Sequence, residues 1–237
     1  MIRVAVVCEG PTDFRAARTL FDRCAAKHLN LDESDLLGKH REFVVVRGHE
    51  YLKWTTVSFI ARELAIRPQP QAEDRSPDHL VARKAILTVE HLVPDISVVI
   101  LLRDQDNDED RRDAIDKAAD RARASVIVGV PRRSIEAWVI TAFSPRSPRD
   151  HIALREVKDR LPFDPTQEAH RLNGRAGDAR DPKQVARDLL GDDVESHCEC
   201  FRSCDLAELK NRGKNVSVAT FIDGVESSLR TLLPRPE

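Results

Sequence analysis

Acidic side chains follow two separate apolar runs of the sequence, and they are the residues whose types and spacing could do chemistry. The runs are IRVAVVC at 2–8 and ISVVILL at 96–102. The acids that follow them are Glu9 with Asp13 in EGPTD, and Asp104 with Asp106 and Asp108 in DQDND. Several carboxylates at one place repel one another unless a cation neutralises them. Hard oxygen ligands of this kind suit Mg²⁺ or Mn²⁺.

The spacing within each group favours a shared ion. Alternate residues of an extended segment point the same way, so Asp104 and Asp106 can hold one cation. Asp13 lies four residues past Glu9, where a helix is expected to begin, and can face the same crevice. Each motif alone also has an ordinary interpretation, because acids after a strand are often solvated and Asp13 can complement a helix dipole. The two motifs together favour a metal site.

The elements that position these acids are predicted to be buried strands. A continuous apolar run is typical of a strand covered on both faces, as in a parallel sheet. Strands are predicted at 2–8, 42–47, 96–102 and 125–130. Helices are predicted after Thr12 as N-cap, at about 52–65, 79–92 and 109–123, and at 134–143 after Ser134 as N-cap. This alternation predicts an α/β fold, a parallel sheet with helices on both faces.

In an open parallel sheet, the ligand site forms beyond the carboxyl ends of the strands. The acids therefore converge if the strands at 2–8 and 96–102 are neighbours. From about residue 145 strand signals vanish, and the last clear helix is at 216–233. We expect a catalytic domain over 1–145 and an α-helical extension over 146–237, with an exposed proline-rich loop at 67–79.

Composition limits the classes of function. The chain has 237 residues, of which 41% are hydrophobic, and its net charge is −2. No global basic field can attract nucleic acid, so such binding needs a local patch or a metal. No apolar run approaches the ~20 residues that span a bilayer. Without a signal-peptide pattern either, the expected location is cytoplasmic, with no membrane partner.

The cysteines offer a second metal hypothesis. His197, Cys198, Cys200 and Cys204 lie close in sequence and could hold zinc. Their Cys-x-Cys-x3-Cys spacing lacks the paired Cys-x2-Cys knuckles of zinc sites, so we favour free thiols. Cys8 and Cys24 fall on apolar faces and are predicted to lie in the core. The chain has no glycine-rich phosphate loop, so an ATPase subunit must come from another chain.

The acidic motifs resemble the Toprim domain, the catalytic fold of topoisomerases, bacterial primases, recombination-repair proteins and overcoming-lysogenisation-defect nucleases. The motif VCEGPTD is most similar to these nucleases and to small Toprim proteins found beside ATPases in phage-defence systems. The segments IEAW at 135–138 and DPK at 181–183 also resemble the small proteins. The stretch from Glu9 to Asp104 is longer than a compact Toprim domain has, and we assign the excess to 52–92.

The resemblance implies roles for particular residues. Glu9, Asp104 and Asp106 match its catalytic acids, and with Asp13 and Asp108 they would hold Mg²⁺ or Mn²⁺. One ion would activate water and another would stabilise the leaving oxygen. Glu9 could act as metal ligand or as general base.

Phosphoryl chemistry also needs a cation for the charge of the transition state. The candidates are Lys183 and the pair Arg132 and Arg133, which could bind nucleic acid. Glu136 is a candidate further acid near the metals. Each has an ordinary interpretation as well: a surface lysine, a solvated loop and a charge at a helix start.

The predicted function is a metal-dependent nuclease that hydrolyses phosphodiester bonds in DNA or RNA. On resemblance alone, it is an anti-phage effector that works with an ATPase partner, and a homo-oligomer stays open because Toprim proteins often assemble. Two alternatives remain. One is an RNA-processing Toprim nuclease like the 5S ribosomal RNA maturase. The other is a non-catalytic binding or regulatory module in which the acids hold one structural ion.

Overall fold

The protein is described here from a computed structural model, which places residues 1–36, 39–68, 76–106 and 108–233. Part of the expected proline-rich loop, residues 69–75, lies outside this described part. The chain forms two compact units. Unit 1 comprises Met1–Arg103, Asp108–Val130 and Asp223–Glu237, and unit 2 comprises Asp104–Asn107 and Pro131–Ile222. The units are interleaved along the chain, and the sequential domains 1–145 and 146–237 stay a prediction.

Unit 1 is built on a parallel sheet, which confirms the predicted α/β class. The strands are β1 (Ile2–Cys8), β2 (Arg41–Phe43), β3 (Leu52–Lys53), β4 (Val98–Leu102) and β5 (Ser125–Gly129). Their order is β2-β1-β4-β5, and β3 pairs with the end of β1. Every pairing between these strands is parallel. The predicted strands at 2–8, 96–102 and 125–130 are therefore present with small changes at their ends.

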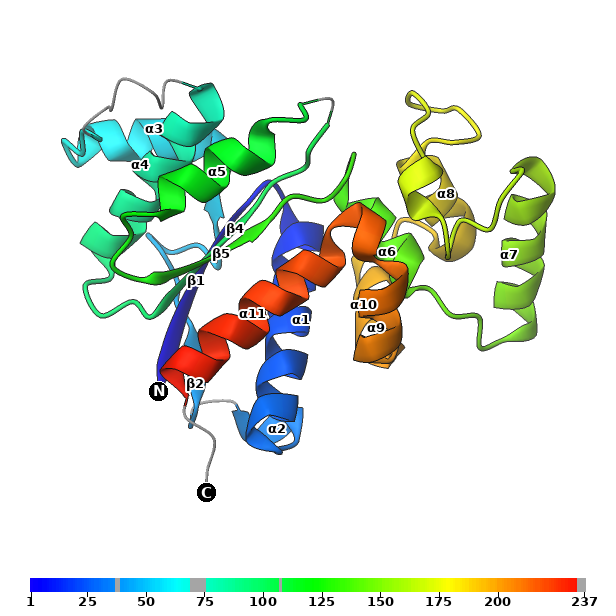
Figure 1. The fold of residues 1–237 in the computed structure, drawn as a ribbon, viewed down its shortest axis with the longest axis horizontal. Coiled ribbons are helices and arrows are strands. Elements are labelled where there is room, and N and C mark those ends of the chain that lie inside the picture. Colours follow the sequence, from blue (N-terminus) through cyan, green and yellow to red (C-terminus); the bar gives the residue numbers. More distant parts are fainter. Residues whose placement is uncertain (37–38, 69–75, 107, 234–237) are drawn as a thin grey trace. The chain divides into compact units, whose positions relative to one another are not determined.

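Except for Arg3, the central strands β1 and β4 are apolar, and helices cover both faces of the sheet (Figure 1). Alternate residues such as Ala5, Val99 and Leu101 share one core cluster with α3, α4 and α5. The helix α1 lies against β1 and β4, and Gly224 of α11 meets Ile127 of β5. These helices are α1 (Pro11–Leu29), α3 (Trp54–Glu63), α4 (Pro77–Leu92), α5 (Arg111–Ala119) and α11 (Val218–Leu232), and a short α2 spans Glu33–Leu36.

The second strand is shorter than predicted, and a hairpin explains the difference. The strand ends at Phe43 instead of continuing to residue 47. Val46 and His49 pair in an antiparallel bridge, with N···O distances of 2.8 and 3.1 Å. Between them, Arg47 and Gly48 have φ values of 52° and 82°. Two residues with positive φ make the tight turn of a β-hairpin, which a purely apolar pattern does not reveal.

The first helix begins earlier than predicted. Gly10 is its N-cap, not Thr12, and Pro11 takes the first helical position. Proline suits this position because its missing N–H would have no helical partner there. The carboxylate of Asp13 accepts hydrogen bonds from the backbone N–H groups of Glu9 and Gly10. Asp13 therefore closes the turn that joins β1 to α1.

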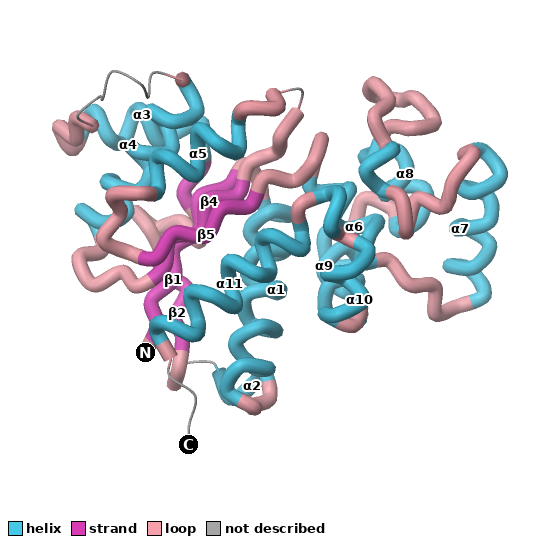
Figure 2. The backbone as a smooth tube through the Cα atoms, in the orientation of Figure 1, coloured by secondary structure: helices cyan, strands magenta, loops and turns pink. Residues whose placement is uncertain are grey.

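Unit 2 is mostly helical (Figure 2). The helices are α6 (Ile135–Ala142), α7 (Pro148–Arg160), α8 (Pro182–Leu190), α9 (Val194–Ser203), α10 (Leu206–Arg212) and the start of α11, with 3₁₀ turns at Ala169–Arg171 and Lys214–Val216. The fully buried Trp138 lies 5.3 Å from the ring of Phe221 and donates a 2.6 Å hydrogen bond to the Val216 carbonyl. Trp138 thus ties α6 to the last segments of this unit.

The described part of the chain contains no helix that is both long and apolar enough to cross a membrane.

Candidate functional site

The strands that precede the two acidic motifs are neighbours. β1 and β4 run parallel in register, with Val7 opposite Leu101. Their carboxyl ends therefore lie at the same edge of the sheet. There, the side chain of Arg103, which follows β4, lies 3.6 Å from the carboxylate of Glu9, which follows β1. The neighbouring strands on which the predicted convergence depends are present, and Asp104 is the next residue after Arg103 in the chain.

The two acids of the EGPTD motif differ in their surroundings. The side chain of Glu9 is 43% exposed beside Arg103. Asp13 is only 6% exposed, and its Oδ2 accepts from the N–H groups of Glu9 at 3.1 Å and Gly10 at 2.8 Å. Asp13 therefore orders the backbone that carries Glu9, a task that its position at the helix start permits.

An ionic network surrounds this edge of unit 1, and its central residue, Asp78, was not predicted from the sequence. Asp78, at the start of α4, is 8% exposed and pairs with both Arg103 and Arg111. Arg111 also lies 4.0 Å from Asp108. The guanidinium of Arg103 lies 5.4 Å from the ring centroid of Trp54. The only signal for this network in the sequence was an arginine placed directly after a buried strand.

The predicted donors fit a hard divalent cation in their chemistry, because carboxylate oxygens are its preferred ligands. Their described arrangement is not that of an assembled metal site. Glu9 faces Arg103, Asp13 bonds backbone amides, and Asp108 Oδ1 accepts from the Asp110 N–H at 3.1 Å. Across the described ranges, no three His, Cys, Asp or Glu side chains gather in a way that could hold an ion.

Unit 2 contains a cleft that brings together three of the predicted residues. The cleft has a volume of about 350 Å³ and is lined by residues 106, 133–134, 174–176 and 181–183. Asp106, Arg133 and Lys183 were predicted from the sequence. Arg132 is exposed and does not line the cleft, so the predicted arginine pair is divided. Arg175 and Ser134 were not identified, because a lone arginine in a polar loop and a serine before a helix are common.

Strained backbone lies at this cleft. Asp106 and Arg133 have φ values of 51° and 67°, a conformation that costs a non-glycine residue about 1–2 kcal/mol. The N–H of Asp106 donates to the Arg133 carbonyl at 3.2 Å, and the N–H of Gln105 donates to the Pro131 carbonyl at 2.9 Å. These bonds hold the two segments together. Strain of this kind often accompanies functional sites.

Two buried oxygens at the start of α6 have no hydrogen-bond partner within the described residues. They are the Ser134 hydroxyl and Oε2 of Glu136. Ser134 is the N-cap residue of α6 and is 5% exposed, yet its side chain does not cap the helix. A buried polar group left unpaired costs about 1–3 kcal/mol. Both oxygens therefore have capacity to bind something outside the described chain.

A compact loop forms the other wall of the cleft. The N–H of Gly174 donates to the Arg180 carbonyl at 2.9 Å. A Cβ at Gly174 would lie 2.7 Å from the Asp181 nitrogen, so only glycine fits there. Asp181 caps α8 by accepting from the N–H of Lys183 at 3.0 Å, and its other oxygen accepts from the N–H of Gly177 at 2.9 Å. These contacts hold Arg175 and Lys183 on the same wall.

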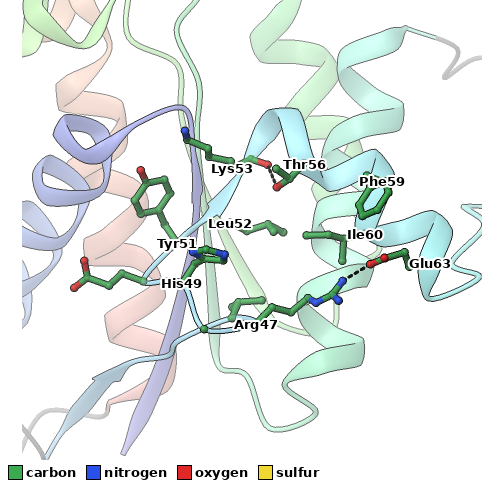
Figure 3. Close-up of a pocket in the computed structure, with 12 residues that line it drawn as sticks. Arg47, His49, Tyr51, Leu52, Lys53, Thr56, Phe59, Ile60 and Glu63 are labelled. Atoms are coloured by element: carbon green, nitrogen blue, oxygen red, sulfur yellow. Dashed lines mark hydrogen bonds and ion pairs between the residues drawn. The ribbon is translucent and has the colours of Figure 1, made fainter.

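A larger pocket of about 740 Å³ lies in unit 1 between the hairpin around residues 46–53 and the helix α3 (Figure 3). None of the predicted site residues lines it. Figure 3 shows the ion pair of Arg47 with Glu63 and the contact between the Thr56 hydroxyl and the Lys53 carbonyl. The ion pair measures 2.5 Å and the hydrogen bond 2.8 Å.

All five cysteines lie among the described residues, are buried and form no disulfide. Cys8 and Cys24 lie in the core as predicted, at 0% and 2% exposure. Burial raises the pKa of the Cys8 thiol well above its ordinary value, with a further contribution from Asp13. Burial also raises the pKa of Cys200 to about 12. Both groups are therefore protonated thiols at neutral pH, which makes them poor nucleophiles.

Comparisons with known protein families, with curated proteins and with solved structures found no match for this chain. The class that the fold defines is an α/β protein with a parallel sheet and a mostly helical C-terminal region.

Proposed function

We propose that the protein is a Mg²⁺-dependent nuclease of the Toprim type that hydrolyses phosphodiester bonds in DNA or RNA. The observation that supports this most is the pairing of β1 with β4 in the middle of the sheet. It makes EGPTD and DQDND the segments that follow two adjacent strand ends. Ligands of open parallel sheets bind beyond these ends.

In this proposal, the residues that hold the metal are Glu9, Asp13, Asp104, Asp106 and Asp108. A bound Mg²⁺ or Mn²⁺ supplies an activated water and charge neutralisation for a scissile phosphate. Glu9 would give up its contact with Arg103 on binding a metal. A partly exposed ion pair is worth about 0–1 kcal/mol, so this loss is small. Asp13 keeps the Glu9 backbone in place, while Lys183 and Arg133 supply positive charge for a phosphate.

The proposal extends to the setting of the enzyme, on the resemblance of its motifs alone. We propose a cytoplasmic anti-phage effector that works with an ATPase partner, and a homo-oligomer stays open because Toprim proteins often assemble.

One set of contacts favours a second candidate, a non-catalytic binding module. Glu9 pairs with Arg103 and Asp13 bonds backbone amides, so both acids have partners without a metal. This module differs from the one predicted from the sequence, in which the acids hold one structural ion, because here the contacts of Glu9 and Asp13 would be permanent. The two candidates differ in whether a divalent cation displaces Arg103.

The decisive experiment is a cleavage assay on plasmid DNA and on a structured RNA with Mg²⁺ or Mn²⁺. The wild-type protein is expected to cut one of them, and chelation with EDTA to stop it. Glu9→Gln and Asp104→Asn are each expected to reduce the rate at least about 100-fold, because removing a ligand weakens the charge stabilisation of the transition state.

The matched control is Glu42→Gln. Glu42 pairs with Arg3 at 3.1 Å and is 45% exposed, close to the 43% of Glu9. It lies on β2, which pairs with the first residues of β1, far along the strand from Glu9. Glu42→Gln should cut at the wild-type rate. Full cleavage by a folded Glu9→Gln protein contradicts the proposal. A wild-type protein that binds nucleic acid but cuts neither substrate supports the binding module.

A further inference from the structure

The cleft of unit 2 has the composition of an anion site. Arg133, Arg175 and Lys183 line it, against two carboxylates, Asp106 and Asp181. Both oxygens of Asp181 accept backbone N–H groups. Arg175 and Lys183 are exposed, and neither forms an ion pair within the residues that the structure covers. Their charges are therefore available to a ligand.

Two helices begin at this cleft. Ser134 is the N-cap of α6, and Asp181 is the N-cap of α8. A helix N-terminus carries partial positive charge and presents backbone N–H groups. Phosphate groups bind at such positions for this reason. Asp181 already caps α8, whereas no side chain caps α6.

The buried hydroxyl of Ser134 gives independent support. Ser134 lines the cleft, is 5% exposed, and has no hydrogen-bond partner in the described chain. A hydroxyl can donate to one oxygen of a bound anion. The cleft thus has a neutral donor, Ser134, on one wall and two exposed cations, Arg175 and Lys183, on the other.

The position of Arg133 is fixed within this arrangement. Its guanidinium donates to the Asn173 carbonyl at 2.6 Å. Asn173 immediately precedes the loop that carries Arg175. The loop itself depends on Gly174, where a side chain would collide with the backbone of residues 180 and 181. The cleft is therefore formed by the folded chain before any ligand arrives.

We propose that this cleft binds a phosphate group through Ser134, Arg133, Arg175 and Lys183. That the phosphate belongs to a nucleic acid backbone rests on the proposed function. The binding of phosphate itself does not depend on it. Arg175 and Ser134 become binding residues beside Lys183 and Arg133. The Ser134 hydroxyl would donate to a phosphate oxygen, and the three cations would favour a ligand that carries negative charge.

The test uses the full chain without divalent metal, titrated with inorganic phosphate and followed by NMR amide shifts. We expect saturable shifts at residues 133–135 and 174–175. Arg175→Ala and Lys183→Ala should each weaken binding at least about fivefold, since each removes a charge-assisted contact. The matched control Arg180→Ala, an exposed arginine of the same loop that does not line the cleft, should bind as wild type does.

Ser134→Ala separates a binding role from a structural one. If the hydroxyl serves a ligand, its removal should weaken phosphate binding but leave the melting temperature of the free protein unchanged or higher. A hydroxyl needed for folding would lower the melting temperature instead. Saturable shifts elsewhere only, or unchanged affinity in both Arg175→Ala and Lys183→Ala, would overturn the assignment.

An oligonucleotide added to the phosphate-loaded protein identifies the carrier. Displacement of the phosphate-induced shifts assigns the cleft to the nucleic acid backbone, and oligonucleotide binding that leaves them in place overturns that carrier. Phosphate binding in a protein that never cleaves nucleic acid retains the cleft and rejects the nuclease. Cleavage of nucleic acid by a protein whose cleft binds no phosphate would retain the nuclease and reject the phosphate site.

Discussion

The edge of the sheet in unit 1 and the cleft in unit 2 differ in how their charges are paired. At the edge of the sheet in unit 1, Asp78 pairs with Arg103 and Arg111, and Arg103 also faces Glu9. In the cleft of unit 2, Arg175 and Lys183 have no acidic partner among the described residues. An arginine paired with a buried acid stabilises the fold, whereas an unpaired exposed cation attracts a ligand. The contrast distinguishes residues that stabilise unit 1 from the cations that we propose bind a ligand in unit 2.

The carboxyl groups show a second contrast. Burial raises the pKa of Asp22 in unit 1 above its ordinary value, although Arg41 opposes the shift. In unit 2, hydrogen bonds from the backbone N–H of Arg146 and from Ser147 lower the pKa of Asp150. Desolvation therefore dominates the pKa shift of Asp22, and hydrogen bonding dominates that of Asp150. The two groups are expected to change the free energy of unfolding with pH in opposite directions.

The largest expected effect on stability is that of Asp78→Ala. It leaves Arg103 and Arg111 without their most buried partner, since the side chains of Asp78 and Arg111 are each 11% exposed. Removing one member of a buried pair destabilises a protein by about 3–5 kcal/mol. Because Arg103 is 24% exposed, we expect the lower end, about 3 kcal/mol, in urea unfolding at neutral pH.

The control for this prediction is Glu42→Ala, which breaks a partly exposed pair with Arg3. Such pairs contribute about 0–1 kcal/mol. Equal losses in both variants would mean that the Asp78 network is no more than a surface feature, and the contrast between the units would weaken.

A smaller effect is expected in unit 2 from Asp181→Ala. It removes the cap of α8 and the bond to the Gly177 N–H. Loss of an N-cap residue costs about 0.5–2 kcal/mol, and we expect about 1 kcal/mol in the same urea experiment. Asp181→Asn should lose less, because its amide oxygen can still cap α8, and only the bond to the Gly177 N–H is lost. If both variants lose the same stability, the charge of Asp181 or its bond to Gly177 matters more than its cap.

The smallest expected effect concerns pH, and its sign differs between Asp22 and Asp150. The pKa of Asp22 is raised in the folded state, so the folded protein binds this proton more tightly than the unfolded chain. Its contribution to the free energy of unfolding therefore falls as pH rises from about 3.8, the ordinary value, through the raised pKa. The lowered pKa of Asp150 contributes stability above 3.8, and this is lost as pH falls through the lowered value.

The measurement is the free energy of unfolding against pH for wild type, Asp22→Asn and Asp150→Asn. Relative to Asp22→Asn, the wild type should become less stable with rising pH, and relative to Asp150→Asn it should become more stable. If the free energy of unfolding changed with pH in the same direction relative to both variants, the pKa shifts of Asp22 and Asp150 would not have opposite signs.

Several features were predictable because their causes are local. The strands β1, β4 and β5 follow from apolar runs long enough to be covered on both faces. The start of α1 was predicted two residues too late, because Gly10 serves as the N-cap and Pro11 occupies the first helical position. The end of β2 was wrong because the valines at 44–46 lead into the Arg47–Gly48 turn, where Val46 bridges to His49 instead of continuing the strand.

The partners of the charged residues could not be predicted. Asp78 lies 25 positions from Arg103 and 33 from Arg111, and nothing in its surrounding sequence indicates either. The cleft of unit 2 likewise joins residues 106, 133–134, 174–176 and 181–183, which no spacing rule connects. Of its cations, Lys183 and Arg133 were identified as candidates, and Arg175 was not.

By itself, the sequence determined where strands and helices form and which acids follow the strands. These depend on side-chain pattern and on backbone preferences over a few residues. Only the tertiary structure decided that β1 pairs with β4, that arginines neutralise the acids of unit 1, and that a basic cleft forms around Ser134. Those contacts depend on packing between residues distant in the chain, and local preference does not specify them.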